Sequence, residues 1–140
     1  MQMPPLDPAI LSRRSEIVSA LRAIVPGEGV IADDDELRAY ECDALTAYQA
    51  LPMAVVLPST TGQIAAILKL CAAEGVKVVP RGAGTSLSGG ALPIVDGIVL
   101  GLGKLNRILD IDLDNRTVTA QPGVTNLGIT HAVEGAGFYY

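Results

Sequence analysis

The stretch VVPRGAGTSLSGG, residues 78–90, is a short apolar run that breaks into a loop with four glycines, two serines and a threonine. Glycine admits positive φ angles and has no Cβ, so the backbone N–H groups of such a loop can pack closely around an anion. No acidic residue lies between Glu74 and Asp96, although the chain has 15 Asp and Glu against 10 Lys and Arg. The stretch therefore predicts a strand followed by an anion-binding loop, and a phosphate or pyrophosphate is the first candidate.

The loop differs from the two most familiar phosphate-binding motifs. No lysine follows its glycines, which argues against a P-loop of the GxxxxGK[ST] type. The third glycine of a GxGxxG motif would fall at Leu87, so the dinucleotide fingerprint also fails. On spacing alone, a surface turn that only connects two strands is an alternative. The length of the loop, its hydroxyl groups and Arg81 at its start favour the anion site.

A strand–helix–strand pattern surrounds the loop. Residues 53–57 are a β-branched apolar run, which is typical of a buried strand. Thr60 and Gln63 have the spacing of a capping box at the start of a helix over residues 61–74. With residues 76–79 as the second strand, the order predicts a parallel βαβ unit with a right-handed crossover.

The segments after the loop predict a further strand, a hairpin and a helix. Residues 97–102 are a third apolar run, and residues 107–112 and 117–121 flank a turn-rich connection. A last helix is predicted within residues 124–136. The fold class is therefore α+β, a small parallel βαβ sheet with flanking helices followed by an antiparallel hairpin.

The first fifty residues are predicted to be helical. Asp7 is the expected N-cap and Pro8 the first residue of one helix that ends at Pro26 and Gly27. The acidic run 33–36 is interpreted as the start of a short helix rather than a metal site, because a helix N-terminus favours negative charge and the run lacks calcium-loop spacing. The apolar stripe of the first helix has helical spacing and consists of Ile10, Leu11, Ile17, Val18, Leu21, Ile24 and Val25.

Composition excludes several classes of protein. With 140 residues, 49% apolar and 18% charged, the chain is long and apolar enough for one globular domain. A net charge of −5 argues against general nucleic-acid binding. The longest apolar runs are too short to span a bilayer, and no signal peptide is visible. Cys42 and Cys71, both expected in a helical context, are interpreted as free thiols of a cytoplasmic protein.

Several segments, in this order, resemble the FAD-linked oxidases of the vanillyl-alcohol oxidase/p-cresol methylhydroxylase type. The resemblance is strongest to the FAD-binding D subunits of glycolate oxidases, and it covers essentially the whole chain from Ile10 onward. The segments that carry it are YECDALTAY (40–48), VVLPSTT (55–61), PRGAGTSLSGG (80–90), NRILDID (106–112) and QPGV (121–124).

The resemblance implies an FAD site. The backbone of residues 81–86 and the nearby hydroxyls would cradle the pyrophosphate, Pro58 would line the adenine side, and residues 121–123 would lie near the flavin. Arg81 has an alternative role, in which its guanidinium braces the loop by bonding carbonyls. The implied cofactor-binding residues are Pro58, Pro80, Arg81, Gly82, Ala83, Gly84, Thr85, Ser86, Ser88, Gly89, Gly90, Gln121, Pro122 and Gly123. The resemblance assigns no catalytic and no metal-binding residue to this chain.

The resemblance also implies that FAD is bound non-covalently. Thr85 stands where covalently linked members of the family have the histidine that attaches to the flavin. His131, the only histidine, is interpreted as a surface or half-buried residue of the last helix.

By the same resemblance, the function is oxidation of glycolate or a related D-2-hydroxy acid. The implied partners are an iron–sulfur subunit and a second flavin-type subunit, which could bring a cytoplasmic protein to the inner membrane. The family's sequence continues past the position of Tyr140, so we expect an N-terminal fragment that is inactive alone and self-associates through an exposed apolar face. Its expected parts are an N-terminal helical segment, residues 1–50, and an incomplete FAD-binding domain of the p-cresol methylhydroxylase (PCMH) type, residues 51–140. The competing hypothesis is a non-enzymatic α+β module that binds a nucleotide or another protein.

Overall fold

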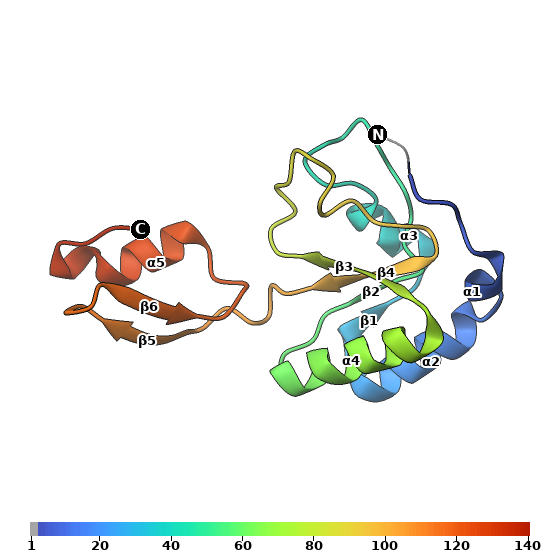
Figure 1. Cartoon of the computed structure of the whole chain (residues 1–140), viewed down its shortest axis with the longest axis horizontal. Helices are drawn as coiled ribbons and strands as arrows, with labels where there is room; N and C mark the ends of the chain where they lie inside the picture. The colour runs from blue at the N-terminus through green and yellow to red at the C-terminus, as the bar shows by residue number, and fades with distance from the viewer. Residues whose placement is uncertain (1–2) are drawn as a thin grey trace.

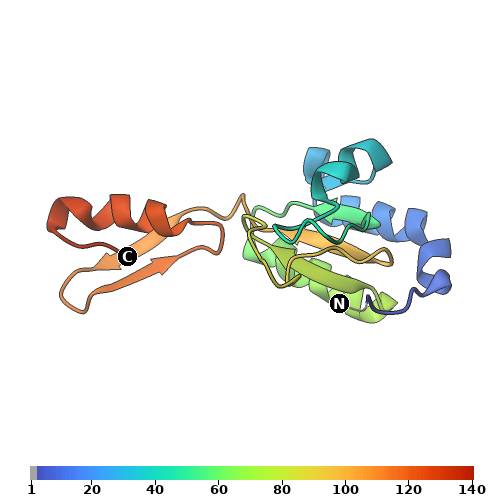
Figure 2. The ribbon, with the colours of Figure 1, turned by 90° about the horizontal axis from the view of Figure 1, so that it is seen from above.

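The computed structural model describes residues 3–140, which form a larger body around a four-stranded sheet and a smaller body of one hairpin and one helix (Figure 1). One chain segment, between β4 and β5, connects the bodies, and the smaller body extends away from the sheet (Figure 2). The helices are α1 (Pro8–Ser12), α2 (Arg14–Ile24), α3 (Asp34–Leu37), α4 (Thr61–Glu74) and α5 (Asn126–Val133), with 3₁₀ turns η1 (Gly27–Gly29), η2 (Arg38–Tyr40) and η3 (Glu134–Ala136). The strands are β1 (Val30–Ile31), β2 (Ala54–Val56), β3 (Lys77–Arg81), β4 (Gly97–Gly101), β5 (Ile108–Asp112) and β6 (Thr117–Ala120).

The main sheet has the strand order β1-β2-β4-β3. β2 and β3 both run parallel to β4, so the predicted parallel βαβ arrangement is confirmed. β4 lies between them and is buried at all five residues, as expected for an apolar strand with neighbours on both sides. β1 pairs antiparallel with β2, a strand that the sequence did not predict. Pro80 is accommodated because β3 is an edge strand.

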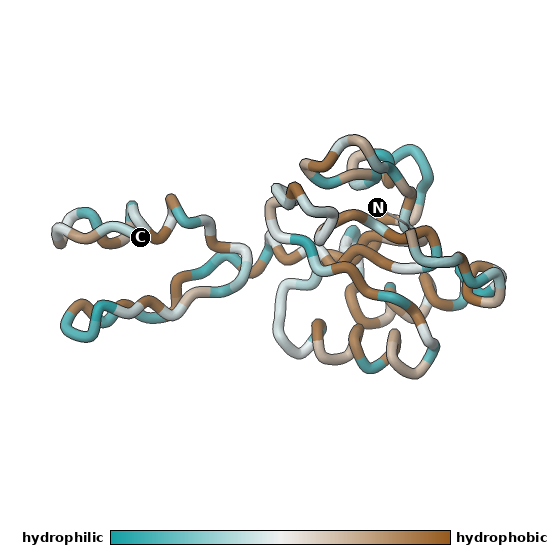
Figure 3. The backbone as a smooth tube through the Cα atoms, turned by 45° about the horizontal axis from the view of Figure 1, so that its top comes forward, coloured by the Kyte–Doolittle hydropathy of each residue, from teal (hydrophilic) through white to brown (hydrophobic). Residues whose placement is uncertain are grey.

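Helices cover both faces of this sheet. One core cluster joins α1, α2 and α4 to the sheet through residues such as Leu21, Ile67 and Ile98, and a second joins Leu37 of α3 to Val55 and Val99 on the opposite face. The apolar segments accordingly concentrate in the middle of the larger body (Figure 3). The N-terminal helices thus share a core with the sheet, and the division of the chain at residue 51 stays a prediction.

The first helix begins as predicted but is broken. Asp7 caps α1 by accepting a hydrogen bond from the N–H of Ala9. The prediction of one continuous helix is wrong, because Arg13 leaves the helical conformation at φ −101° and ψ 11°. The two arginines at the break are tied to other elements: Arg13 pairs with Glu74 of α4, and Arg14 donates to the carbonyls of Met53 and Ala32. These contacts tie the break between α1 and α2 to α4 and to the residues next to β1 and β2.

The other predicted caps are largely confirmed. Asp33 accepts from the first N–H groups of α3, as the acidic run suggested. Thr60 Oγ1 accepts from Gln63 N–H at 3.1 Å, but Gln63 Oε1 accepts from Ser59 N–H rather than from Thr60. Gly75, at φ +71°, ends α4 in the left-handed conformation that favours glycine.

The smaller body is the predicted antiparallel hairpin with its helix. β5 and β6 pair antiparallel, and the connection passes through Arg116 at φ +56°. Thr125 caps α5 through a 3.0 Å bond from Gly128 N–H, and His131 is exposed.

The two cysteines differ in environment. Cys71 lies in α4, and burial raises its thiol pKa to about 11. Cys42 lies outside every helix, so the expected helical context is wrong for this residue, which follows the η2 turn. Both are free thiols. Across residues 3–140, no helix combines the length and the apolar character needed to cross a membrane.

Asp96, just before β4, ties the N-terminal segment to the sheet. Its side chain is 1% exposed, and its Oδ2 accepts from Lys77 Nζ at 2.5 Å and from Asp7 N–H at 2.9 Å. Burial alone would raise the pKa of Asp96, but the hydrogen bonds from Lys77 and Asp7 outweigh it, so the pKa lies below its ordinary value. This carboxylate therefore stabilises the fold above its unfolded-state pKa, and the contribution is lost as the pH falls through the lower folded-state pKa.

Replacing Asp96 by asparagine is expected to lower the free energy of unfolding by about 1–2 kcal/mol at neutral pH. The difference from the wild type should narrow at about pH 3, where the carboxylate of the unfolded wild-type chain is already mostly protonated. Urea unfolding of the variant and the wild type, at neutral pH and at about pH 3, measures this difference in the free energy of unfolding. Asp110→Asn, at an exposed carboxylate of β5, is the control and should cost less than about 0.5 kcal/mol. An equal loss for Asp96→Asn at both pH values would contradict this account.

Candidate functional site

The candidate site lies where the three parallel strands end. The carboxyl ends of β2, β3 and β4 meet at one edge of the sheet, the usual position of ligands in open parallel sheets. The glycine-rich loop follows β3 there, and the linker to the hairpin follows β4 on the same side, facing the smaller body (Figure 1). Leu102 N–H donates to Arg81 O at 2.9 Å and so ties the start of the linker to the start of the loop.

The first half of the loop exposes unpaired backbone donors. The N–H groups of Ala83, Gly84, Thr85 and Ser86 have no hydrogen-bond partner among residues 3–140. Gly84 at φ +72° and Gly89 at φ +75° adopt the left-handed conformation. Successive free N–H groups around such a turn form a concave site for an anion.

The second half of the loop is braced internally. Ser86 Oγ accepts from Ser88 N–H at 3.3 Å and from Gly90 N–H at 3.1 Å. These bonds fold the second half of the loop around Ser86. They also engage the Ser86 oxygen as an acceptor, so this hydroxyl has only its proton left to offer a ligand.

The Arg81 side chain holds the end of the loop. Its side chain is buried, and both Nε and Nη2 donate to the carbonyl oxygen of Ala91, where the loop ends. Burial lowers the pKa of the Arg81 guanidinium, and the nearby Asp43 carboxylate opposes this effect. The structure therefore has the Arg81 side chain in the bracing role.

Gly123 sets the crossing of the linker to the hairpin and the connection between β6 and α5. Its N–H donates to Leu105 O at 2.8 Å. A Cβ at this position would lie 2.5 Å from Leu102 O and 2.8 Å from Leu105 O, both closer than real Cβ atoms approach. The connection between β6 and α5 can therefore pass this close to the linker only with glycine at residue 123.

A cavity of about 390 Å³ joins the loop to this crossing. It brings the predicted pyrophosphate loop together with two of the three residues predicted to lie near the flavin. The first turn of α5 also contributes, and the N–H groups of Asn126 and Leu127 have no partner within the described residues. A helix N-terminus of this kind favours an anion. The lining residues are Gly82, Ala83, Thr85, Gly103, Pro122, Gly123, Val124, Thr125 and Asn126.

The remaining candidates lie beside the cavity rather than in its wall. Pro58 follows β2 at the same sheet edge, but its ring is almost fully buried. Gln121 is engaged with the hairpin, where its Oε1 accepts from Arg107 N–H at 3.0 Å. Pro80, Arg81, Gly84, Ser86, Ser88, Gly89 and Gly90 form or support the loop without lining the cavity. Their roles toward a cofactor stay predictions.

Sequence reasoning missed Asp43 as part of this site. Its Oδ2 accepts from Ala91 N–H at 3.3 Å, opposite the Arg81 contact. Asp43 lies 38 positions before Arg81, and only the folded chain brings the two together. The available signal was its place within residues 40–48, one of the segments that carries the family resemblance.

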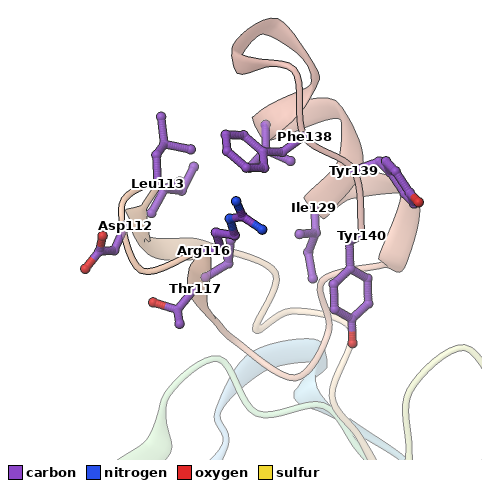
Figure 4. Close-up of a pocket in the computed structure, with 11 residues that line it drawn as sticks. Asp112, Leu113, Arg116, Thr117, Ile129, Phe138, Tyr139 and Tyr140 are labelled. Carbon is purple, nitrogen blue, oxygen red and sulfur yellow. The ribbon is translucent and has the colours of Figure 1, made fainter.

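A second cavity, of about 420 Å³, lies between the hairpin and α5 (Figure 4). Its lining includes Leu113, Ile129 and Phe138, with the guanidinium of Arg116 pointing between them and the side chains of Tyr139 and Tyr140 at one side. None of the predicted cofactor residues lines it. It is largely an apolar groove, whereas the smaller cavity at the sheet edge lies beside the free N–H groups of the loop and is the better candidate for a cofactor site.

The residues at the sheet edge suit a cofactor with a pyrophosphate. Free N–H donors, glycines that allow close approach and a helix N-terminus all favour a compact anion, and no carboxylate lies in the loop to repel it. The chemistry of this donor set therefore fits FAD, the cofactor that the family resemblance implies.

Comparison with known proteins supports the predicted family and the predicted fold class. Residues 52–140 match the family described as FAD binding domain. The glycolate oxidase subunit GlcD of Escherichia coli K12 is 46% identical over 127 residues, 91% of this chain and 26% of that protein. A protein of Oryza sativa subsp. indica named as a probable mitochondrial D-2-hydroxyglutarate dehydrogenase is 30% identical over 94% of this chain and 24% of its own length. The chain thus spans about a quarter of the length of these relatives.

The fold is shared with solved enzyme structures. The crystal structure of p-cresol methylhydroxylase superposes with a TM-score of 0.78 at 23% identity, covering 96% of this chain and 27% of that one. The structure of 4-ethylphenol oxidase from Gulosibacter chungangensis gives 0.79 at 22% identity, covering 97% of this chain and 27% of that one. At these identities the likeness establishes the fold alone, which agrees with the predicted fold class.

Proposed function

The chain belongs to the FAD binding domain family, whose cofactor is FAD, and on this basis we propose that it forms the FAD-binding part of a flavin-dependent oxidoreductase that oxidises glycolate or a related D-2-hydroxy acid. The identity to proteins named as glycolate oxidase subunits and D-2-hydroxyglutarate dehydrogenases supports this substrate class. The observation that carries the proposal is the row of four free N–H groups in the loop beside the cavity at the sheet edge.

The residues of this chain hold and orient the cofactor. When bound, FAD would accept a hydride equivalent from the α-carbon of the hydroxy acid. The free N–H groups of residues 83–86 donate to the pyrophosphate oxygens, and the first turn of α5 adds the favourable end of its dipole. Ser86, through its bonds to Ser88 and Gly90, keeps the loop in the shape that presents these donors.

The isolated 140-residue chain is expected to hold FAD weakly. Cofactors are usually buried over most of their surface, whereas the cavity at the sheet edge offers donors mainly for the pyrophosphate. Leu127, Tyr139 and Tyr140 are exposed, and the two tyrosines line the groove between the hairpin and α5. We propose that the chain self-associates through this apolar face.

The proposed setting is a complex of several subunits. The name of the 46% identical relative calls it a subunit, which supports this proposal. By family resemblance, the partners would be an iron–sulfur protein and a second flavin-type subunit, in the cytoplasm or at the inner membrane surface.

FAD is expected to be released completely when the full-length protein is precipitated with acid. Thr85 has no nucleophilic ring nitrogen, and neither cysteine lies in the loop, so no residue there can attach to the flavin. Absorbance of the supernatant and the pellet measures the release. Yellow colour that stays with the denatured pellet would contradict non-covalent binding.

The function is tested with the full-length protein. We expect flavin absorption bands in the freshly purified protein and loss of these bands when glycolate or D-lactate is added without oxygen. L-lactate is the control and should leave the bands unchanged. A protein that is colourless and stays colourless with added FAD would contradict the proposal and favour a non-enzymatic module.

A further inference from the structure

Two buried charged side chains hold Ala91, the residue that closes the loop. Its N–H donates to Asp43 Oδ2 at 3.3 Å, and its carbonyl oxygen accepts from Nε and Nη2 of Arg81. Asp43 is 5% exposed, Arg81 is 7% exposed and Ala91 is 8% exposed. Both backbone groups of Ala91 are therefore fixed by ionised partners shielded from water, and charge-assisted bonds of this kind are stronger than neutral ones.

The segment around Asp43 also contacts the middle of the loop. Asp43 Oδ1 accepts from Leu45 N–H at 2.9 Å, which fixes the local turn. This turn places Ala44 N–H 3.0 Å from Gly84 O, to which it donates. Asp43 thus connects one rigid turn to the loop at two points, Gly84 and Ala91, on either side of the braced Ser86.

The two charged side chains hydrogen-bond to the same residue, Ala91. Within the described residues, Asp43 and Arg81 form no ion pair, and neither lines the cavity at the sheet edge. Burial of charged groups costs free energy, and apolar side chains of similar size often give equal stability. What an apolar pair could not do is hold the N–H and the C=O of Ala91 at the same time.

The geometry points to Asp43 and Arg81 as positioning residues that fix Gly84 and Ala91, and so hold the N–H groups between them in the arrangement that binds the pyrophosphate. This inference rests on the proposed function, because it takes the loop as the cofactor site. It predicts that loss of either side chain weakens FAD binding without removing any group that touches FAD.

The experiment compares near-isosteric variants of the full-length protein. Asp43→Asn has one acceptor oxygen in place of two, so it cannot serve both Leu45 and Ala91. Arg81→Lys keeps the charge but loses the two donors that bond to Ala91 O. It is also expected to weaken FAD binding, so it tests the inference even if Asp43→Asn does not fold. Asp96→Asn is the matched control, because it alters another buried carboxylate at the opposite end of β4.

Two readouts are needed: the FAD dissociation constant of the apoprotein and hydrogen exchange of residues 83–91 without FAD. We expect Asp43→Asn and Arg81→Lys to raise the dissociation constant at least about tenfold and to speed exchange in the loop. Asp96→Asn should lower stability yet leave both readouts at wild-type values.

The outcomes separate the inference from the proposed function. Unchanged loop exchange and FAD affinity in both Asp43→Asn and Arg81→Lys would overturn the inference alone, as would an equal loss of affinity in Asp96→Asn. A wild-type apoprotein that binds no FAD would overturn the proposed function, and the positioning role with it.

Discussion

Replacement of Gly84 by valine is expected to abolish FAD retention by the full-length protein while its fold persists. Gly84 has φ +72°, a conformation that is strongly unfavourable for a β-branched residue. A Cβ there would also contact the Arg81 side chain at 3.6 Å, so the valine methyl groups would press on the residue that braces the loop. Flavin content per protein, measured by absorbance, and circular dichroism of the fold check this expectation.

Gly27→Val is the matched control for Gly84→Val. Gly27 has φ +73° and open space around its Cβ position, so valine introduces the same backbone strain before β1, which β2 and β4 separate from the strand that carries the loop. Each substitution is expected to cost about 1–2 kcal/mol of stability from this strain, but only Gly84→Val should lose flavin. Normal flavin content in Gly84→Val would refute the assignment of the loop to the pyrophosphate.

Replacement of Gly123 by alanine is expected to displace the hairpin and α5 from the sheet edge. The new methyl group would overlap the carbonyl oxygens of Leu102 and Leu105, and both are backbone atoms that cannot rotate away. Overpacking of this kind typically costs about 1–3 kcal/mol. Because Gly123 lines the cavity, FAD affinity should also fall at least about tenfold. Urea unfolding and FAD titration measure the two effects.

Gly135→Ala serves as the control for Gly123→Ala. A Cβ at Gly135 meets nothing within 4 Å, and the residue lies in the η3 turn, which contributes no residue to the cavity at the sheet edge. This variant should keep wild-type stability and FAD affinity. If Gly123→Ala behaves like Gly135→Ala, the close crossing of the linker and the connection between β6 and α5 does not matter for the site.

Elements that depend on local signals could be predicted from the sequence. β2, α4 and the hairpin followed from apolar runs, capping residues and turn residues, all of which act within a few positions. The parallel arrangement of β2 and β3 followed from their connection through α4, since crossovers of this length join parallel strands.

Elements that depend on distant contacts could not be predicted. The two residues of β1 are a strand only because β2 lies beside them. The break at Arg13 depends on contacts with α4 and with the residue before β2. The position of β4 between β2 and β3 is likewise a property of the assembled sheet.

The candidate site also has a part that local signals predict and a part that depends on distant contacts. Glycine and hydroxyl content predicted an anion-binding loop over residues 82–90, because those residue types are needed for a close backbone approach. The role of Gly123 at the crossing and that of Asp43 at Ala91 depend on contacts across 18 and 48 positions of the chain. No local pattern carries such information.

The central claim is that the N–H groups of residues 83–86 bind the FAD pyrophosphate. Amide NMR of the 140-residue chain during titration with FAD tests it most directly, because fast exchange reports even weak binding. The account predicts the largest shift changes at Ala83, Gly84, Thr85 and Ser86, with smaller changes at residues 122–127. ADP, which carries the same pyrophosphate, should reproduce the changes at residues 83–86. Shift changes confined to the groove of Ile129, Phe138 and Tyr140, or none at saturating FAD, would contradict the claim.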